Sequence, residues 1–288
     1  HSLAMRVLSR KHVLEAVGRT PRSLNTFETK ALICDIAGAS GGKRPAKKMI
    51  QGYTAAWAQS QGDEPGFAKT DEQKAFQAAL LGWLEFHEGM LIGELIPYLV
   101  RYLKDNPAAA ERSEFKHLLV DEFQDLNKAE QTAIAYFGET AEICIVGDDD
   151  QSIYSFKCAH PDGIREWKDL HPECADLEMA DCHRCPTTVV EMANALINVN
   201  ANRAPRVLTP LPEKGAGEVA IVQVPFLHNE ATWITTKIKD LLDKGVHPSE
   251  IIILVQREVA GRPILNSLKG EGIPAKSYYE ESQLASEA

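Results

Sequence analysis

The sequence predicts an α/β fold in which short parallel strands alternate with helices. Apolar runs that end in acidic residues occur at 116–120 and 142–146, and the segment 127–138 between them has helical character. Runs of this length are typical of buried parallel strands. The alternation returns later in the chain, where apolar runs at 218–224 and 251–255 flank another helical segment. Each half of the chain is therefore expected to contain a strand–helix–strand unit.

Helices are expected to surround these strands. Residues 1–35 have mostly helical character, whereas 36–72 are rich in Gly, Pro, Lys and Gln and predict a loop with a short helix. Between 71 and 104 apolar residues recur at helical spacing, and Pro97 is expected to begin or kink a second helix there. Further helices are predicted after Pro186, over 229–244 with Gly245 as C-terminal cap, and over 263–269.

Length and composition describe an ordinary globular protein. The chain has 288 residues, of which 44% are hydrophobic and 25% charged, and this length suffices for about two packed domains. No apolar run has the length of a membrane span, and the first residues lack a signal-peptide pattern. The six cysteines are then most simply reduced thiols, so we expect a cytoplasmic protein. The net charge of −10 argues against nonspecific coating of nucleic acid but permits a local basic groove.

The string LLVDEFQD at 118–125 carries the strongest chemical signal. An apolar strand there delivers two adjacent carboxylates, Asp121 and Glu122, to the sheet edge at which open α/β folds bind ligands. Mg²⁺ prefers hard oxygen ligands, so one carboxylate beside nucleotide phosphates is enough to hold it. The second carboxylate can polarise an attacking water. An acidic turn after a core strand is the alternative for any isolated Asp-Glu pair, and the full string is much more specific.

A second string, VGDDDQSIYSFK at 146–157, again ends a strand in Gly-Asp. The neutral amide of Gln151 suits a sensor of a γ-phosphate or of the water that attacks it. Tyr154, Phe156 and Lys157 follow at once. Aromatic rings interleaved with a cation suit single-stranded nucleic acid, because bases stack on the rings and the cation meets phosphate. The alternative is that the two aromatic residues belong to the core at strand spacing.

These two strings, in this order, resemble the second and third motifs of superfamily 1 DNA helicases of the UvrD/PcrA/Rep group. The first residues, HSLA, are similar to the Thr-Phe-His-Ser segment of that family, and CHRCP at 182–186 lies where the family has Asn-Tyr-Arg-Ser. Residues 253–257 and 268–274 are similar to a strand–Arg–helix–Gly-Ile-Pro segment of the second motor domain. Between about 12 and 105 the similarity is limited to helical character.

The resemblance implies an ATP-dependent DNA helicase that translocates 3′ to 5′, uses ATP and Mg²⁺, and binds single-stranded and duplex DNA. Its fold would consist of RecA-like (P-loop NTPase) parallel-sheet cores with a helical insertion subdomain. Residues 1–12 and 105–177 would form part of the first motor domain, 13–104 the insertion, and 178–288 part of the second motor domain. A repair or replication accessory protein is a further expected partner, and no membrane is expected.

The roles of individual residues follow from the same resemblance. Asp121 would hold Mg²⁺, usually through water, and Glu122 would be the general base. Gln151 would couple the nucleotide state to DNA contacts, and Arg184 would stabilise charge on the transferring phosphoryl group. Arg257 corresponds to a nucleotide-binding arginine of the family. The residues that would contact DNA are His1, Tyr154, Phe156 and Lys157.

Two positions depart from the family pattern. The family usually has Trp-Arg where this chain has Phe156 and Lys157, so stacking is retained but bidentate phosphate geometry is lost. The Asn-Tyr pair before the family's arginine is replaced by Cys182 and His183. The assignment of Arg184 therefore rests on its context, and an ordinary surface arginine before a helix is the alternative.

A phosphate-binding loop of the form G-x-x-x-x-G-K-S/T does not occur in the sequence. The nearest match, at 38–43, is one residue too short, and Arg44 stands where the hydroxyl should be. We interpret 38–43 as a flexible loop. We expect the chain to be an internal piece of a longer helicase, with the phosphate loop before His1, the late motifs after Ala288, and little ATPase activity by itself.

Three alternatives remain open. The pair Cys182 and Cys185 allows a zinc or redox site, although a single Cys-x-x-Cys is a weak signal. A non-catalytic DNA- or protein-binding module derived from a helicase is the second alternative, and the intact acidic pair and Gln151 argue against it. The third is part of a helicase–nuclease of the AddA/RecB type, for which the chain shows no nuclease carboxylate cluster.

Overall fold

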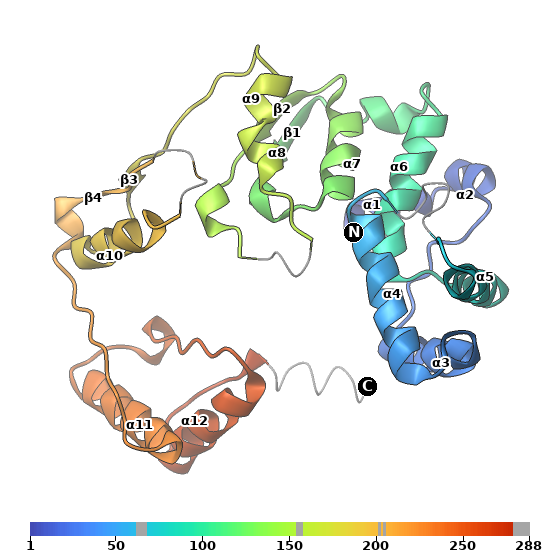
Figure 1. Cartoon of the computed structure of the whole chain (residues 1–288). Helices are drawn as coiled ribbons and strands as arrows, with labels where there is room; N and C mark the ends of the chain where they lie inside the picture. The colour runs from blue at the N-terminus through green and yellow to red at the C-terminus, as the bar shows by residue number, and fades with distance from the viewer. Residues whose placement is uncertain (62–67, 154–157, 201–202, 204–205, 279–288) are drawn as a thin grey trace. The chain divides into compact units, whose positions relative to one another are not determined.

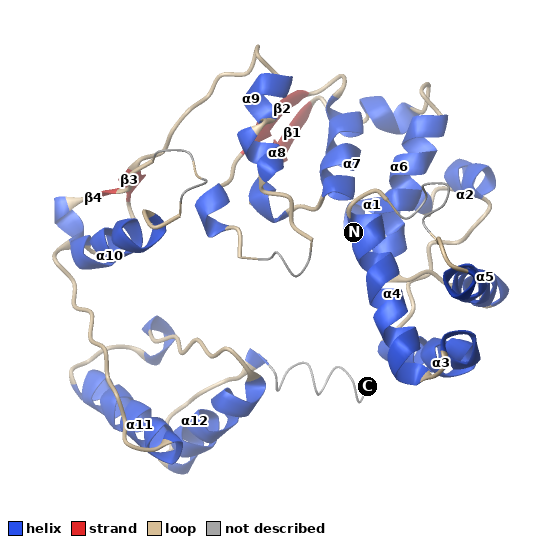
Figure 2. Ribbon diagram, in the orientation of Figure 1, coloured by secondary structure: helices blue, strands red, loops and turns tan. Residues whose placement is uncertain are grey.

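The computed structural model describes residues 1–61, 68–153, 158–200, 203 and 206–278. Contacts divide the chain into two units, which we describe separately. The first contains His1–Cys185 and Val190–Lys214, and the second contains Pro186–Val189 and Gly215–Ala288. Helices predominate in the described residues, and the strands there form two small parallel sheets (Figure 2).

The elements follow one another along the chain as labelled in Figure 1. In order, they are α1 (Ser2–Leu8), α2 (Lys11–Val17), α3 (Thr26–Asp35), α4 (Lys43–Ala58), α5 (Asp71–Phe86), α6 (Leu95–Asp105), β1 (His117–Val120), α7 (Lys128–Gly138), β2 (Glu142–Ile145), α8 (Asp162–Arg165), α9 (Trp167–Leu170), β3 (Asp181–Cys182), α10 (Thr187–Ile197), β4 (Thr209–Pro210), α11 (Leu227–Asp243) and α12 (Glu258–Gly270).

The strand–helix–strand unit predicted around the acidic string is present in the first unit. β1 and β2 pair in parallel, with His117 opposite Glu142 and Val120 opposite Ile145. The connecting helix α7 begins at a capping box, in which the side chain of Asn127 accepts from the N–H of Glu130. One face of α7 packs with α1 and α6 in a buried apolar cluster, as Figure 1 lets the reader follow. The sequence prediction is confirmed for these elements.

The same strands are less buried than predicted. Exposed and half-buried residues alternate along both strands, and the side chain of Leu119 is 80% exposed. Among the described residues only β1 and β2 form this sheet, so one of its faces lacks a covering layer. The structure therefore shows helices with small parallel sheets, and the larger RecA-like core that we expected is not reproduced.

A second apolar cluster holds α3, α4 and α5 together. The helix α4 has 16 residues and occupies much of the region for which we predicted a loop with a short helix. That prediction was wrong because Ala46, Ile50, Tyr53 and Trp57 recur at helical spacing and are all buried. The polar residues that suggested a loop lie on the exposed face of this helix, where charged side chains are ordinary.

The glycine-rich segment 38–43 runs from the end of a short 3₁₀ helix (Ile36–Ser40) through a turn at Gly41 and Gly42 to Lys43, the first residue of α4. The 3₁₀ helix follows α3 rather than a strand, so the segment does not have the strand–loop–helix context of a phosphate-binding loop. Gly41 and Gly42 have φ angles of 73° and 135°, which favour glycine. The buried hydroxyl of Ser40 donates to the carbonyl of Gly42 at 3.2 Å. Our expectation of a flexible loop is replaced by a turn with defined hydrogen bonds.

The second unit is built on α11 and α12, whose buried residues form its apolar cluster. The C-terminal cap predicted for the first of these helices is present, because Gly245 has a φ of 88° and its N–H donates to the carbonyl of Leu242 at 2.9 Å. The helix predicted over 263–269 begins earlier, at Glu258, and contains Pro263 in its interior.

The strands predicted at 218–224 and 251–255 are not formed. A strand needs a neighbour that accepts and donates backbone hydrogen bonds, and neither segment pairs with another strand in the described residues. Residues 251–255 nevertheless alternate, because Ile251 and Ile253 pack against the helices while Leu254 is 85% exposed. The segment was predicted as a strand buried on both faces, and only one of its faces is covered.

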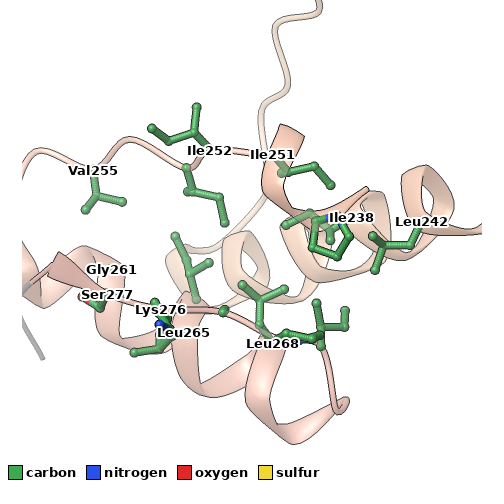
Figure 3. A pocket seen from close by; sticks show the side chains of 16 residues that line it. Ile238, Leu242, Ile251, Ile252, Val255, Gly261, Leu265, Leu268, Lys276 and Ser277 are labelled. Atoms are coloured by element: carbon green, nitrogen blue, oxygen red, sulfur yellow. The ribbon is translucent and has the colours of Figure 1, made fainter. Parts of the chain in front are cut away.

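Between this segment and the two helices lies an apolar cavity of about 250 Å³, shown in Figure 3. Its walls include Ile238 and Leu242 of α11, Leu265 and Leu268 of α12, and Val255 opposite them. Most of the lining side chains are aliphatic, and Lys276 and Ser277 are the polar residues among them. Among the described residues no helix has both the length and the apolar character that a membrane crossing requires.

Candidate functional site

The acidic pair lies directly after β1. Asp121 and Glu122 are both exposed at the carboxyl end of the strand. Glu122 has a φ of 52°, a left-handed conformation that residues other than glycine adopt rarely and mostly in constrained turns. Its backbone N–H donates to Oδ1 of Asp121 at 2.9 Å, which fixes the Asp121 carboxylate against this turn.

The second string leaves the sheet at the same edge. Because β1 and β2 are parallel and in register, their carboxyl ends lie side by side. The pairing continues past the strands, since the N–H of Phe123 donates to the carbonyl of Val146 at 3.0 Å. The strand ends that carry Asp121 and Glu122 therefore lie beside the segment that leads to Gln151.

Asp148 organises the turn that follows β2. Its side chain accepts from the backbone N–H of Asp150 at 3.1 Å and from Nε2 of Gln151 at 2.9 Å. These bonds cap a short 3₁₀ helix over Asp149–Gln151. Gln151 is exposed at the end of this helix, and its amide oxygen can accept a hydrogen bond in addition to the bond that Nε2 donates.

Gln124 joins the two strings. Its side chain is buried, with 1% of the residue exposed. Nε2 donates to Oε2 of Glu122 at 2.8 Å, and Oε1 accepts the backbone N–H of Asp148 at 3.0 Å. One buried amide thus fixes the Glu122 carboxylate and the start of the second string at once, and the sequence analysis did not assign it a role.

Gly147 is required by this close approach. A Cβ atom at this position would lie 2.5 Å from Oε1 of Gln124 and 2.8 Å from Cδ1 of Ile164. Both distances are shorter than carbon atoms tolerate, and the amide is held by its two hydrogen bonds. The Gly-Asp sequence at the strand end is therefore explained by packing, independently of any ligand.

The three aspartates of the second string are paired with arginines. Arg203 donates to Asp150, with Nη2 2.6 Å from Oδ2. Arg165 donates through Nε to Oδ2 of Asp149 at 2.6 Å. Nη2 of Arg206 lies 3.3 Å from Oδ1 of Asp148, and the same group contacts Asp149. The hydrogen bonds to Asp150, more than the charge attraction, raise the pKa of Arg203.

Asp121 and Glu122 have a different environment. In the described part of the chain their side chains form hydrogen bonds only with the backbone N–H of Glu122 and with Gln124, and no cation pairs with either. Two adjacent uncompensated carboxylates at a sheet edge attract a divalent cation, and hard carboxylate oxygens fit Mg²⁺. No group of three or more His, Cys, Asp or Glu side chains in the described residues has metal-binding geometry, so phosphate and water would have to complete such a site.

The remaining predicted residues are distributed over the chain. Arg184 is exposed in the bend after β3, and among the described residues it forms no ion pair with the acidic edge. Arg257 is exposed at the start of α12 in the second unit. Nδ1 of His1 lies 3.6 Å from Oε1 of Glu130. The predicted DNA contacts Tyr154, Phe156 and Lys157 lie outside the described residues.

The residues that sequence reasoning missed are Gln124 and the three arginines. Gln124 stands inside the string that we had singled out, so a buried polar residue two positions after Glu122 was a usable signal. The arginines have no such signal. Arg203 is 53 positions from Asp150 in the sequence, and only the folded chain brings the two together.

Comparisons with known proteins identify the family of this chain. A family model described as the UvrD/REP helicase N-terminal domain matches residues 1–172. DNA helicase II of Haemophilus influenzae is 32% identical over 189 residues, which cover 64% of this chain and 26% of that protein. DNA helicase II of Escherichia coli is 30% identical over 169 residues, or 58% and 23% of the two chains.

A third relative is similar to this chain over a comparable length. ATP-dependent DNA helicase PcrA of Leuconostoc citreum is 28% identical over 184 residues, which cover 61% of this chain and 24% of that protein. The chain spans about a quarter of the length of the curated relatives it matches.

Proposed function

Because the chain belongs to the family of UvrD/REP helicases, we propose that it forms part of a motor that unwinds DNA with the energy of ATP hydrolysis. The observation that carries this proposal is the pair Asp121 and Glu122, which no cation of the described residues neutralises and which lies at a sheet edge beside the segment that ends in Gln151. Phosphoryl transfer by this class of enzyme depends on positioning and electrostatics, for which such an edge is suited. Translocation from 3′ to 5′ is part of the proposal, on the strength of the family resemblance.

Asp121 is the residue that would hold Mg²⁺, usually through water. Its carboxylate is exposed, lacks a cationic partner in the described residues and is oriented by the Glu122 N–H at 2.9 Å. When bound with ATP, Mg²⁺ would neutralise negative charge on the phosphates during transfer. Asp148 is less suited to this role, because it already accepts two hydrogen bonds and pairs with Arg206.

Glu122 would be the general base that takes a proton from the attacking water. A base must be an unprotonated carboxylate whose orientation is fixed before the reaction. Gln124 supplies that orientation by donating to Oε2 at 2.8 Å, which leaves Oε1 of Glu122 available to accept from water. The constrained φ of 52° at Glu122 keeps this side chain at the sheet edge.

Gln151 would couple the nucleotide state to the DNA contacts. Its amide donates to Asp148 at 2.9 Å and is exposed, so it can exchange this bond for one with phosphate or water without a change in charge. The DNA-contacting residues would be His1, Tyr154, Phe156 and Lys157. The last three follow Gln151 within six positions in the sequence.

Arg184 and Arg257 would supply positive charge to the phosphates. Both side chains are exposed and form no ion pair among the described residues, so each guanidinium can bind a phosphate. We propose RecA-like motor domains at 1–12 with 105–177 and at 178–288, with 13–104 as a helical insertion. We further propose a cytoplasmic protein that works with a repair or replication accessory protein.

The test of the function is DNA-dependent ATP turnover in the longest natural protein that contains this chain. Glu122→Gln keeps the shape of the side chain but removes the base, so kcat should fall by about 100-fold or more while ATP affinity changes by less than about twofold. Glu142→Gln is the matched control, because Glu142 is an exposed carboxylate at the opposite end of β2 and, among the described residues, forms an ion pair only with His117. Equal turnover in both variants would refute the role of Glu122.

The isolated chain provides a second measurement. We propose that it turns over little ATP, because its sequence contains no G-x-x-x-x-G-K-S/T loop to position the phosphates. It should still bind oligo-dT weakly and lose that binding as salt rises. Robust turnover by the isolated chain that Glu122→Gln abolishes would contradict this part of the proposal.

A further inference from the structure

The segment that follows α10 is attached to the second string by an arginine–aspartate pair. Arg203 binds the carboxylate of Asp150 through two donors, since Nε donates to Oδ1 at 3.0 Å and Nη2 donates to Oδ2 at 2.6 Å. The two side chains are 11% and 15% exposed, so salt and water screen this pair little. A two-donor pair of this kind fixes direction as well as distance, because the guanidinium is planar and its donors have a rigid spacing.

The same guanidinium also binds its own segment. Nη1 of Arg203 donates to Oδ1 of Asn198 at 3.1 Å, and Nη2 donates to the backbone carbonyl of Arg206 at 2.9 Å. Arg206 reaches the second string as well, because its Nη2 lies 3.3 Å from Oδ1 of Asp148. The bonds of Arg203 therefore join the described residues of 198–206 to the second string in one connected group.

The two aspartates in these pairs lie on either side of the turn that carries Gln151. Asp150 directly precedes Gln151 in the short 3₁₀ helix over Asp149–Gln151. Asp148 accepts from Nε2 of Gln151 at 2.9 Å, and its backbone carbonyl accepts the N–H of Gln151 at 2.9 Å. A change in the position of these aspartates therefore changes the position of the Gln151 amide.

The segment is also fixed to α10 and to the small sheet of β3 and β4. The side chain of Asn194 in α10 donates to the carbonyl of Leu208 at 2.9 Å and accepts the N–H of Leu208 at 3.1 Å. The next residue, Thr209, begins β4 and pairs in parallel with Asp181 of β3 (Figure 1). Arg203 thus links the second string to a part of the chain that is held by its own hydrogen bonds.

We propose that Arg203 is a positioning residue for Gln151. It acts through Asp150 and fixes the turn from which the Gln151 amide reaches the γ-phosphate or the attacking water. Arg165 differs, because it binds Asp149 from the adjacent helix α8 and adds no link to a distant part of the chain. The inference rests on the proposed role of Gln151 and adds a residue to that site.

The test is a double-mutant cycle on ATP turnover, in the longest natural protein that contains this chain and with oligo-dT present. Arg203→Gln loses the charge and the two-donor geometry, so kcat should fall about tenfold while KM for ATP changes by less than about twofold. In a Gln151→Ala background the same substitution should change kcat by less than about twofold, because two residues that act through one another are not additive. An unchanged kcat in Arg203→Gln, or an equal loss in both backgrounds, would overturn the proposal.

Arg112→Gln is the matched control. The side chain of Arg112 is 14% exposed, and Nε donates to Oε2 of Glu139 at 3.0 Å while Nη1 donates to the carbonyl of Leu103 at 2.7 Å. Arg112 therefore resembles Arg203 in burial and in its kinds of partner, but among the described residues it has no bond to the second string. Arg112→Gln should lower the free energy of unfolding and leave kcat within about twofold of the wild-type value. A fall in kcat as large as that of Arg203→Gln would show that lost stability alone explains the effect.

Hydrogen exchange of the whole 288-residue chain tests the link without ATP or DNA. In Arg203→Gln the backbone N–H groups of a peptide that contains 148–153 should exchange at least about tenfold faster than in the wild type, and in Arg112→Gln they should keep the wild-type rate. Arg203→Lys keeps the charge without the two-donor geometry and should give an intermediate rate. Unchanged exchange in Arg203→Gln would overturn the proposal. Faster exchange together with full ATP turnover by Gln151→Ala would instead refute the proposed role of Gln151, and with it the catalytic consequence of Arg203.

Discussion

Two carboxylate sites in the first unit differ in their surroundings. Glu111 is 1% exposed, and its oxygens contact Nη1 of Arg10 at 2.9 Å, Nε2 of His12 at 2.8 Å and the hydroxyl of Tyr102 at 3.0 Å. The acidic edge of Asp121 and Glu122 is exposed, and no cation pairs with it in the described residues. A buried carboxylate that is bound by cations and hydrogen-bond donors of the protein serves the fold. An exposed carboxylate without a cationic partner can instead be stabilised by a bound cation, which makes it a candidate for a functional site.

The titration of Glu111 follows from its partners. Burial by itself would raise the pKa of Glu111, but the hydrogen bonds that start with Arg10 outweigh it and lower that pKa to about 2. In the same cluster, burial and the hydrogen bond to Glu111 raise the pKa of Tyr102 to about 12. The Glu111 carboxylate and the Arg10 guanidinium, whose pKa is raised first by its hydrogen bond to Glu111, thus stay ionised over the physiological range, whereas Tyr102 stays a neutral phenol.

The largest loss of folding stability is expected from Glu111→Gln. This change removes the buried anionic partner of Arg10, which keeps only the more exposed Glu114, and breaking a buried pair on one side typically costs about 3 kcal/mol or more. The free energy of unfolding, measured with urea, should fall by about that amount.

Glu114→Gln is the control for Glu111→Gln. Glu114 binds the same arginine, with Nη2 of Arg10 2.8 Å from Oε2, but its side chain is 28% exposed. Solvent screening should limit its effect to about 1 kcal/mol. Equal losses in the two variants would show that burial does not distinguish the two carboxylates.

A slightly smaller loss of stability is expected when the pH is lowered. The folded pKa of Glu111 is lowered, from 4.5 to about 2, so its stabilisation is complete above pH 4.5 and is lost as pH falls toward 2. The shift corresponds to about 3 kcal/mol at most, of which more than half should be lost by about pH 3. Other carboxylates titrate in this window, so the quantity to measure is the difference in unfolding free energy between the wild type and Glu111→Gln. That difference should shrink on acidification, and a constant difference would contradict the assignment.

An intermediate loss of folding stability is expected from Gln124→Leu at the acidic edge. Leucine has a similar size but leaves the N–H of Asp148 without its buried acceptor, which costs about 1–3 kcal/mol. Urea unfolding should detect this loss. Gln223→Leu, at an exposed position of the second unit, should change stability by less than about 0.5 kcal/mol. An unchanged stability in Gln124→Leu would mean that the amide does not join the two strings.

These two regions also show what the sequence could predict. The strand–helix–strand unit with acids at the strand ends was predicted correctly, because short apolar runs that end in acidic residues and the helical character between them are local signals. The helix α4 was missed because its polar face dominated its composition. The strands at 218–224 and 251–255 were predicted from hydrophobicity alone, and hydrophobicity does not supply a pairing partner.

In the candidate site, too, features encoded by neighbouring residues were predicted, and features that depend on distant residues were not. Asp121, Glu122 and Gln151 were found because their strings are contiguous in the sequence. The pairing of Arg203 with Asp150 and of Arg10 with Glu111 spans 53 and 101 positions, respectively. Such pairs depend on the folded path of the chain, so no spacing rule predicts that the aspartates of the second string are neutralised while the acidic edge is not.

The smallest effect on stability is expected from Glu122→Gln, which is the same chemical change as Glu111→Gln. Glu122 is exposed, and an amide oxygen can accept the bond from Gln124 in place of the carboxylate, so the unfolding free energy should change by less than about 0.5 kcal/mol. Removing one of two adjacent like charges should even be slightly favourable. A loss as large as that of Glu111→Gln would mean that the acidic edge is a structural element with hidden partners, and the argument for a ligand at this edge would fail. If Glu122→Gln keeps its stability and loses ATP turnover as proposed above, Glu111 acts in folding stability and Glu122 acts in the reaction.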